Sequence, residues 1–140
     1  MNYDPVFDKW HEECGVFGVY DRTVDVARYV YWGLFALQHR GQESAGIAVT
    51  DGHDVELKKG MGLLTEAIKE LPSLPSHMGT GHVRYSTTGS NNPRNIQPLV
   101  IHYQGGQIAV AHNGNLTNAL AIRKRLEADG SIFQTTMASE

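Results

Sequence analysis

The chain has 140 residues, of which 41% are hydrophobic and 19% charged, and its formal net charge is −3 at pH 7. This composition is typical of a folded domain with a sizeable core, and it excludes a disordered or fibrous chain. The small negative charge and the scattered Lys and Arg residues exclude nucleic acid as an expected partner. No apolar run reaches the length of about 18 residues that a membrane helix needs, and residues 1–13 lack the features of a secretory signal. We therefore expect a cytoplasmic location and no membrane partner.

The first half of the chain predicts a strand, a helix and a hairpin. Residues 16–20 are apolar and partly β-branched, which predicts a buried strand. Residues 25–38 carry apolar side chains at spacings of three or four and predict a helix that stops at Gly41. The runs 47–49 and 55–58 flank the polar sequence Asp-Gly-His-Asp, which predicts a hairpin with a four-residue loop.

The second half predicts further strands between two helices. In chain order we expect a short helix over 65–71 that Pro72 ends, strands over 79–84, 99–103 and 108–112, and a last helix from 116 or 117 to 129. Clusters of strands with helices between them indicate an α+β fold class, with helices packed on sheets.

Cys14 is the single cysteine and lies directly before the first expected strand. Near neutral pH a thiol is a better nucleophile than a hydroxyl, because its free pKa is about 8.5. If the bond between Glu13 and Cys14 is cut, the new α-amine can accept and return the proton of the same residue's sulfur. Taken alone, Cys14 is better explained as a buried structural cysteine at the start of a strand, because such cysteines are common and unreactive.

The histidines do not predict a metal site. The seven histidines include no His-x-His or His-Glu-x-x-His spacing, and no cysteine pair accompanies them. We therefore expect no metal in this segment. A single cysteine also excludes an internal disulfide, which fits a reducing compartment.

Three later segments join the Cys14 segment in a recognisable order. They are Leu-Gln-His-Arg-Gly-Gln-Glu-Ser-Ala-Gly-Ile over 37–47, Gly-His-Val-Arg-Tyr-Ser-Thr-Thr-Gly over 81–89 and Ala-His-Asn-Gly-Asn-Leu over 111–116. Together the four motifs resemble the amidophosphoribosyltransferase family, the glutamine-dependent enzymes that open purine synthesis, over nearly all of 14–140. The related glucosamine-6-phosphate synthase type has a Tyr-Arg-Gly-Tyr-Asp kind of segment where this chain reads Gln-His-Arg-Gly-Gln-Glu, so the purine type is favoured.

The resemblance implies a fold and a division of the chain. The fold is the N-terminal nucleophile hydrolase fold, an αββα sandwich, which is expected to be incomplete at the C-terminus of this sequence. Residues 1–13 are expected to be a leader, or propeptide, that self-cleavage before Cys14 removes. Residues 14–140 are expected to be part of a type 2 glutamine amidotransferase domain, and the phosphoribosyltransferase domain of the family is absent from this sequence.

The resemblance also implies the site residues. Cys14 is the expected nucleophile, Asn113 and Gly114 are expected to bind glutamine and its developing oxyanion, and Arg84 is expected to clamp the α-carboxylate of glutamine. By themselves these residues allow other interpretations. Asn-Gly favours a type I′ hairpin turn, and Arg84 could form a surface ion pair at the end of a strand.

Three neighbouring residues receive weaker expectations. Arg40 and Gly41 are expected to shape a loop over the site, since Gly41 can adopt a positive φ and Arg40 can pair with a carboxylate. His82 is expected to pack or to form a nearby hydrogen bond, and it receives no chemical role.

The reaction implied for this segment is the glutaminase half of the family's activity. Cys14 attacks the side-chain amide of glutamine, and the ammonia released converts phosphoribosyl pyrophosphate to 5-phosphoribosylamine in the first step of de novo purine synthesis. Phosphoribosyl pyrophosphate and Mg²⁺ are expected only in the missing domain, no cofactor is expected in this segment, and an iron-sulfur cluster in the parent enzyme is left open. The parent enzyme is expected to be a homo-oligomer.

One departure from the family pattern supports an alternative. Ala138 stands where the family usually has an aspartate that meets the α-ammonium group of glutamine, and loss of one charged partner often costs about 2–5 kcal/mol. The alternatives are therefore a non-catalytic remnant with impaired substrate binding, or the glutaminase domain of another class II amidotransferase.

Overall fold

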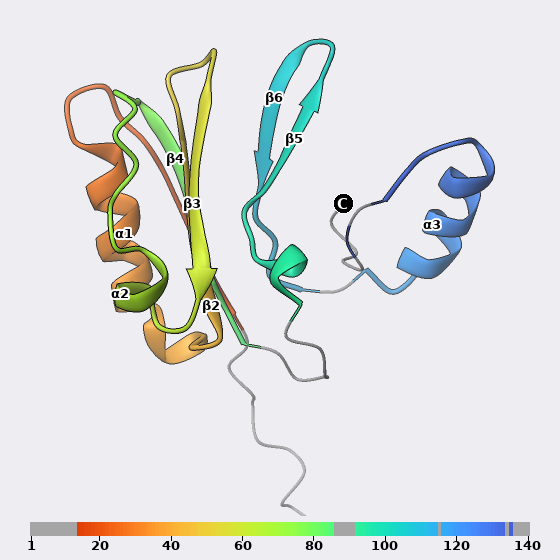
Figure 1. Ribbon diagram of the computed structural model, residues 1–140, viewed down its shortest axis with the longest axis horizontal. Helices are drawn as coiled ribbons and strands as arrows, with labels where there is room; N and C mark the ends of the chain where they lie inside the picture. Colours follow the sequence, from red (N-terminus) through yellow and green to blue (C-terminus); the bar gives the residue numbers. More distant parts are fainter. Residues whose placement is uncertain (1–13, 86–91, 115, 134, 136–140) are drawn as a thin grey trace, which may run out of the picture.

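A four-stranded antiparallel sheet forms the centre of the protein, whose computed structural model describes residues 14–85, 92–114, 116–133 and 135. The order of the strands is β1-β4-β2-β3, and all three pairings are antiparallel. Figure 1 shows this sheet with helices on one side and a separate hairpin on the other. The strands are β1 (Gly15–Tyr20), β2 (Ser44–Thr50), β3 (Val55–Met61) and β4 (Met78–Arg84).

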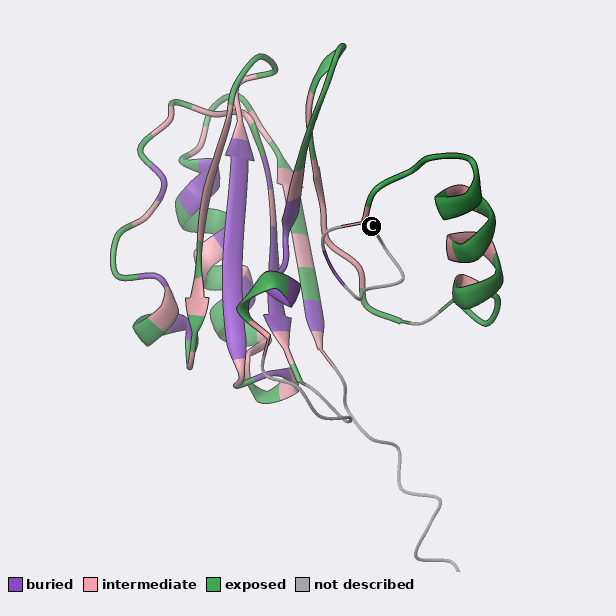
Figure 2. Cartoon of the chain, turned by 45° about the vertical axis from the view of Figure 1, so that its right-hand side comes forward, coloured by how far each residue is buried: buried purple, intermediate pink, exposed green. Residues whose placement is uncertain are grey.

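Helix α1 (Val26–Ala36) and the short helix α2 (Leu64–Ala67) cover one face of the sheet. Asp25 caps α1, because its carboxylate accepts a hydrogen bond of 3.1 Å from the main-chain N–H of Arg28. The buried face of α1 packs on alternate residues of the strands, and burial is concentrated between these two layers (Figure 2). The largest apolar side chains without exposed surface in this core are Val30, Leu34, Ile47, Leu64 and Val83.

Two glycines of β4 allow α1 to approach the sheet closely. A Cβ atom added at Gly81 would lie 2.7 Å from Leu34 Cδ1 and 2.7 Å from Val30 Cγ1. A Cβ atom at Gly79 would lie 2.8 Å from Val26 Cγ1. Real Cβ atoms do not tolerate such distances, so α1 can lie this close to the sheet only because both positions are glycine.

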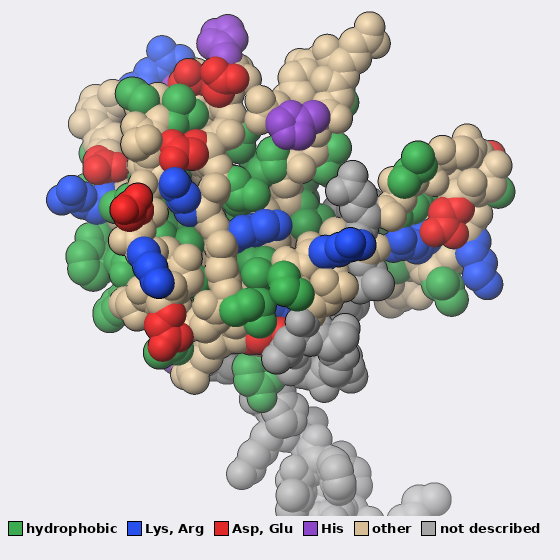
Figure 3. Space-filling view, in the orientation of Figure 1, with side chains coloured by type: hydrophobic (Ala, Val, Ile, Leu, Met, Phe, Trp, Pro, Cys, Tyr) green, Lys and Arg blue, Asp and Glu red, His purple; other side chains and the backbone are tan. Residues whose placement is uncertain are grey.

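A two-stranded hairpin forms a second sheet on the side of the central sheet opposite α1 (Figure 1). Its strands are β5 (Leu99–Tyr103) and β6 (Gly106–Val110), and a 3₁₀ helix (Pro93–Asn95) precedes them. Between β3, β5 and residues 131–133 lies a cavity of about 1020 Å³, lined by hydrophobic and basic side chains that include Lys59, Leu99 and Phe133 (Figure 3).

Helix α3 (Ala119–Ala128) lies beyond the hairpin and contains no buried residue in the described structure (Figures 1 and 2). Its apolar residue Leu120 is 68% exposed. No helix in the described ranges is long and apolar enough to cross a membrane.

The α+β class, the presence of every predicted strand and the hairpin are confirmed, but several boundaries differ. The prediction that the first strand is buried is wrong, because β1 lies at the edge of the sheet and its Tyr20 is 61% exposed. Helix α1 ends at Ala36, and a 3₁₀ helix (Gln38–Arg40) carries the chain to Gly41. Helix α2 is shorter than predicted, since it covers only 64–67 of the stretch before Pro72. Strand β6 lies two residues earlier than predicted, because a tight turn joins it to β5 and pairs Tyr103 with Gly106.

We expect the substitution Gly81→Ala to destabilise the protein by about 1–3 kcal/mol, because the added methyl group would overpack the interface between α1 and β4. Urea denaturation monitored by circular dichroism measures this change. The matched control is Gly18→Ala on β1, where the nearest atom lies 3.8 Å from the added Cβ. This control should change the free energy of unfolding by no more than about 0.5 kcal/mol. Equal effects of the two substitutions would contradict the packing argument.

Candidate active site

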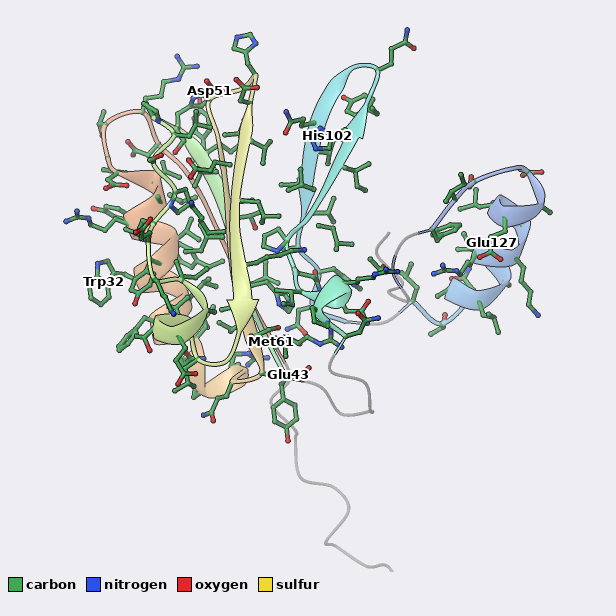
Figure 4. All side chains as sticks on the ribbon, viewed as in Figure 1. Trp32, Glu43, Asp51, Met61, His102 and Glu127 are labelled. Atoms are coloured by element: carbon green, nitrogen blue, oxygen red, sulfur yellow. The ribbon has the colours of Figure 1, made fainter. Side chains whose placement is uncertain are left out.

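Cys14 lies at the end of the sheet where β1 begins and β4 finishes. The register pairs Gly15 with Val83, so Cys14 is level with the last residues of β4. Its Sγ atom accepts a hydrogen bond of 3.4 Å from the main-chain N–H of Tyr85 and lies 3.5 Å from the carbonyl oxygen of the same residue. In Figure 4 the labelled Glu43 and Met61 mark this end of the sheet, and Asp51 marks the opposite end.

The main chain of Cys14 is held by two side chains from distant segments. The Nε atom of Arg40 donates a hydrogen bond of 2.6 Å to the carbonyl oxygen of Cys14. The Nδ2 atom of Asn113 lies 3.5 Å from the same oxygen and donates to it. Cys14 also has a φ of 49°, in the left-handed region that non-glycine residues rarely adopt.

Arg84 is enclosed by protein groups beside Cys14. Its Nη1 atom donates a hydrogen bond of 3.0 Å to the carbonyl oxygen of Asn95, and its Nε atom lies 3.8 Å from Oε1 of Glu43. The side chains of Arg84 and Glu43 are each only 16% exposed. This arrangement differs from a surface ion pair at a strand end, and it fixes the direction of the guanidinium group.

Gly41 keeps the Arg40 segment close to β4. A Cβ atom at Gly41 would lie 2.6 Å from the main-chain carbonyl carbon of Arg84. The φ of Gly41 is −163°, so the expectation of a positive φ there is wrong, and close approach is the reason for glycine. The Nε atom of Arg40 binds the main-chain carbonyl of Cys14, so the Arg40 segment is tied directly to the start of β1.

Asn113 and Gly114 follow β6 in an irregular segment. Strand β6 ends at Val110 and the next element is α3, so the dipeptide does not form the turn of a hairpin. Gly114 has a φ of 142°, which glycine adopts without the strain that a side chain would add. The side chain of Asn113 is exposed and turned toward Cys14.

His82 lies two residues before Arg84 on β4, so both side chains are on the same face of the strand. It is 1% exposed, and burial of the ring lowers its pKa to about 4, against a smaller raising effect from its hydrogen bond with the main chain of His112. The positive charges of Arg84 and His112 lower the pKa further. Within the described structure, Nε2 of His82 and Oγ of the neighbouring Ser44 have no hydrogen-bond partner.

The structure thus brings together the four residues that the sequence singled out: Cys14, Arg84, Asn113 and Gly114. Their individual roles in the reaction stay predictions. The leader, residues 1–13, and Ala138 lie outside the described residues. In the described part of the chain, no group of three or more His, Cys, Asp or Glu residues could hold a metal ion.

Sequence reasoning missed four residues that shape the site: Glu43, Tyr85, Asn95 and Gln97. Tyr85 and Asn95 act through main-chain atoms, which leave no signal in the identity of the side chain. Glu43 falls within a quoted motif, but only the structure shows that it faces Arg84. Gln97 precedes a proline in a polar stretch and carries no pattern that indicates a role.

Comparison with known proteins agrees with this geometry. A family model described as glutamine amidotransferases class-II matches residues 41–131. The chain is 48% identical over 130 residues to the amidophosphoribosyltransferase of Methanocaldococcus jannaschii and 47% identical over 133 residues to that of Bacillus subtilis. These matches cover 91% and 93% of this chain and 28% of each relative.

A solved structure matches as well. The glutamine phosphoribosylpyrophosphate amidotransferase from B. subtilis, complexed with ADP and GMP, superposes with a TM-score of 0.80 at 44% identity. The match covers 89% of this chain and 27% of that chain. It confirms the N-terminal nucleophile hydrolase fold.

The chain belongs to the class-II glutamine amidotransferases. Within that class the predicted resemblance to the amidophosphoribosyltransferases is confirmed by these relatives, of whose length the chain spans little more than a quarter.

We expect His82 to make the protein sensitive to mild acid. The pKa of His82 is lower in the folded protein, about 4, than its ordinary value of 6.5, so the unfolded chain binds the proton more tightly. The stability is complete above pH 6.5 and falls as the pH drops toward 4. Between pH 6.5 and 4.5 the loss should be about 2–3 kcal/mol, measured by urea denaturation across this range.

The variant His82→Gln serves as the comparison for this pH series. Asp21, Asp51 and Glu56 have lowered pKa values too, but their ordinary values of 3.8 to 4.5 place their effects lower in pH. The slope between pH 6.5 and 4.5 should therefore flatten in His82→Gln. An unchanged slope would show that His82 does not cause the acid sensitivity.

Proposed function

We propose that this chain is the glutaminase part of an amidophosphoribosyltransferase. The observation that carries the proposal is the convergence on Cys14 of the Tyr85 main-chain N–H and the Asn113 side-chain amide, with Arg84 fixed next to them. A nucleophile, hydrogen-bond donors and a cationic anchor at one edge of a sheet are the parts that hydrolysis of an amino-acid amide needs.

The first chemical step is acyl transfer from glutamine to Cys14. The sulfur attacks the carbonyl carbon of the side-chain amide, a carbon–sulfur bond forms, and the carbonyl oxygen takes the negative charge. The amide group of Asn113 and the main-chain N–H of Gly114 stabilise this oxyanion. The carbon–nitrogen bond then breaks, ammonia leaves with a proton, and water hydrolyses the thioester to glutamate.

Arg84 supplies the anchor for the α-carboxylate of glutamine. Its guanidinium group is a planar fork that can bind two carboxylate oxygens, and its contacts with Asn95 and Glu43 hold that fork in place. A fixed cation costs less entropy on substrate binding than a mobile one. Arg84 therefore sets the distance between the anchored end of glutamine and the attacking sulfur.

Cleavage before Cys14 would suit both the backbone and the chemistry. The dihedral φ of Cys14 exists only while residue 13 is attached, and its value of 49° costs about 1 kcal/mol for a residue with a side chain. Cutting the bond removes this strain and releases an α-amine with a pKa near 8 next to the thiol. That amine then serves as the proton acceptor and donor of the reaction.

The remainder of the proposed activity requires a second site, in addition to the one around Cys14. Ammonia would pass to a phosphoribosyltransferase domain that binds phosphoribosyl pyrophosphate with Mg²⁺ and forms 5-phosphoribosylamine. We further propose a cytoplasmic, homo-oligomeric parent enzyme. The sequence similarity over 91–95% of this chain to relatives that carry the enzyme's name supports the proposed amidophosphoribosyltransferase activity.

Alkylation by the glutamine analogue 6-diazo-5-oxo-norleucine tests the nucleophile. We expect intact-mass spectrometry to show one adduct, located on Cys14 by peptide mapping, and protection from labelling by excess glutamine. The variant Cys14→Ser should take up no label at this position. Labelling that persists in Cys14→Ser, or that glutamine does not slow, would reject Cys14 as the nucleophile.

Substitution of Asn113 tests the oxyanion donor. We expect Asn113→Ala to lower kcat for glutamine hydrolysis by about 10²–10³, because a donor to the transition state is lost. Ammonia release in a coupled glutamate dehydrogenase assay measures the rate. Asn118 provides the control, since it is exposed and its side chain does not cap α3, and Asn118→Ala should leave kcat within about twofold.

A further inference from the structure

Residues 95–97 form a buried segment that is fastened to the sheet at three points. Arg84 donates to the carbonyl oxygen of Asn95, and the Nζ atom of Lys59 donates a hydrogen bond of 3.0 Å to the carbonyl oxygen of Ile96. The carbonyl oxygen of Gln97 lies directly over Gly46 of β2, where a Cβ atom would collide with it. All three residues of the segment are at most 5% exposed. These contacts therefore hold the segment firmly against the end of the sheet where Cys14 lies.

The side chain of Gln97 extends from this segment and binds the main chain of His112 twice. Oε1 of Gln97 accepts a hydrogen bond of 2.6 Å from the N–H of His112, and Nε2 donates one of 3.1 Å to the carbonyl oxygen of His112. The β5–β6 ladder ends with the pair Leu99 and Val110, and continuation of its register places Gln97 opposite His112. Beyond the last residue pair of the ladder, the side-chain amide of Gln97 thus forms the two hydrogen bonds to His112 that a paired strand residue would form with its main chain.

His112 directly precedes Asn113 and Gly114. Without the two bonds from Gln97, nothing in the β5–β6 ladder would restrain the chain after Val110. With them, the direction of the chain is set one residue before the amide that reaches Cys14. The buried ring of His82 also forms a hydrogen bond with the main chain of His112.

We propose that Gln97 is a positioning residue that aims Asn113 and Gly114 at the oxyanion formed on Cys14. The inference rests on the proposed glutaminase function and deepens it. Because Arg84 and Gln97 hold the same segment, the anchor for the carboxylate and the donors for the oxyanion share one rigid support. A displacement of about 1 Å in such a support can cost about 10²-fold in rate.

Steady-state kinetics of the full chain tests the proposal. We expect Gln97→Ala to lower kcat for glutamine hydrolysis by about 10- to 100-fold with a change in KM below about threefold, since the oxyanion donors act only in the transition state. The exposed Gln104 in the hairpin turn offers a matched control, and Gln104→Ala should leave both constants unchanged. A rise in KM with unchanged kcat would overturn the proposal.

A double-mutant cycle separates positioning from a general structural effect. If Gln97 acts through Asn113 as well as Gly114, then Gln97→Ala should cost clearly less in an Asn113→Ala background than in the wild type, and the loss that remains comes from Gly114. Losses that multiply in the double variant would overturn the proposal, because they would mean that Gln97 acts independently of Asn113.

Hydrogen exchange supplies a readout that does not need activity. In Gln97→Ala the amide of His112 should exchange at least about tenfold faster, while the amides of the central strand β2 keep their protection. Unchanged exchange at His112 would overturn the inference even in an active enzyme. A wild-type chain that hydrolyses no glutamine would reject the proposed function, and the exchange result would still decide whether Gln97 holds the His112 segment.

Discussion

The pairing of β1 with β4 is the contact on which the site depends. It places Cys14, at the start of one strand, beside Tyr85, just after the end of the other. A shift of this register by one residue would turn every side chain of β1 to the opposite face. The register is secured by packing, because Phe17 and the glycines of β4 fit against α1 on the buried face of the sheet. A hydrophobic interface on one side of the sheet therefore fixes the position of a nucleophile at its edge.

Around Cys14, side chains bind mainly to main-chain atoms. Arg40 and Asn113 reach the carbonyl oxygen of Cys14, Arg84 reaches that of Asn95, and Gln97 binds both polar atoms of the His112 main chain. Main-chain groups cannot change rotamer, so such bonds join distant segments with little freedom. The site gains its rigidity from these cross-links between loops and strand ends, and an exposed donor such as Asn113 can stay directed at Cys14.

Local patterns in the sequence predicted the strands because their apolar runs are short and bounded by clear turn residues. The same patterns could not give the end of α2, where the chain leaves the helix at Ile68 well before the proline that was expected to stop it. They also placed Gly41 in the correct loop for the wrong reason, since close contact with Arg84 is invisible without the fold. For the site, family motifs indicated Cys14, Arg84, Asn113 and Gly114. Gln97 escaped notice because its function depends on a register between two strands, which a single sequence does not display.

The residues that contact Cys14 lie far from it along the chain, and this separation has a consequence for protein synthesis. Tyr85 and Asn113 lie 71 and 99 residues beyond Cys14. At translation speeds of about 5–20 residues per second, Asn113 is made on the order of 5–20 s after Cys14. During that interval the thiol is an ordinary cysteine on a nascent chain, and long-range strand pairing must close before it meets its donors. The site around Cys14 can therefore form only after the ribosome has synthesised Asn113 and the strands have paired.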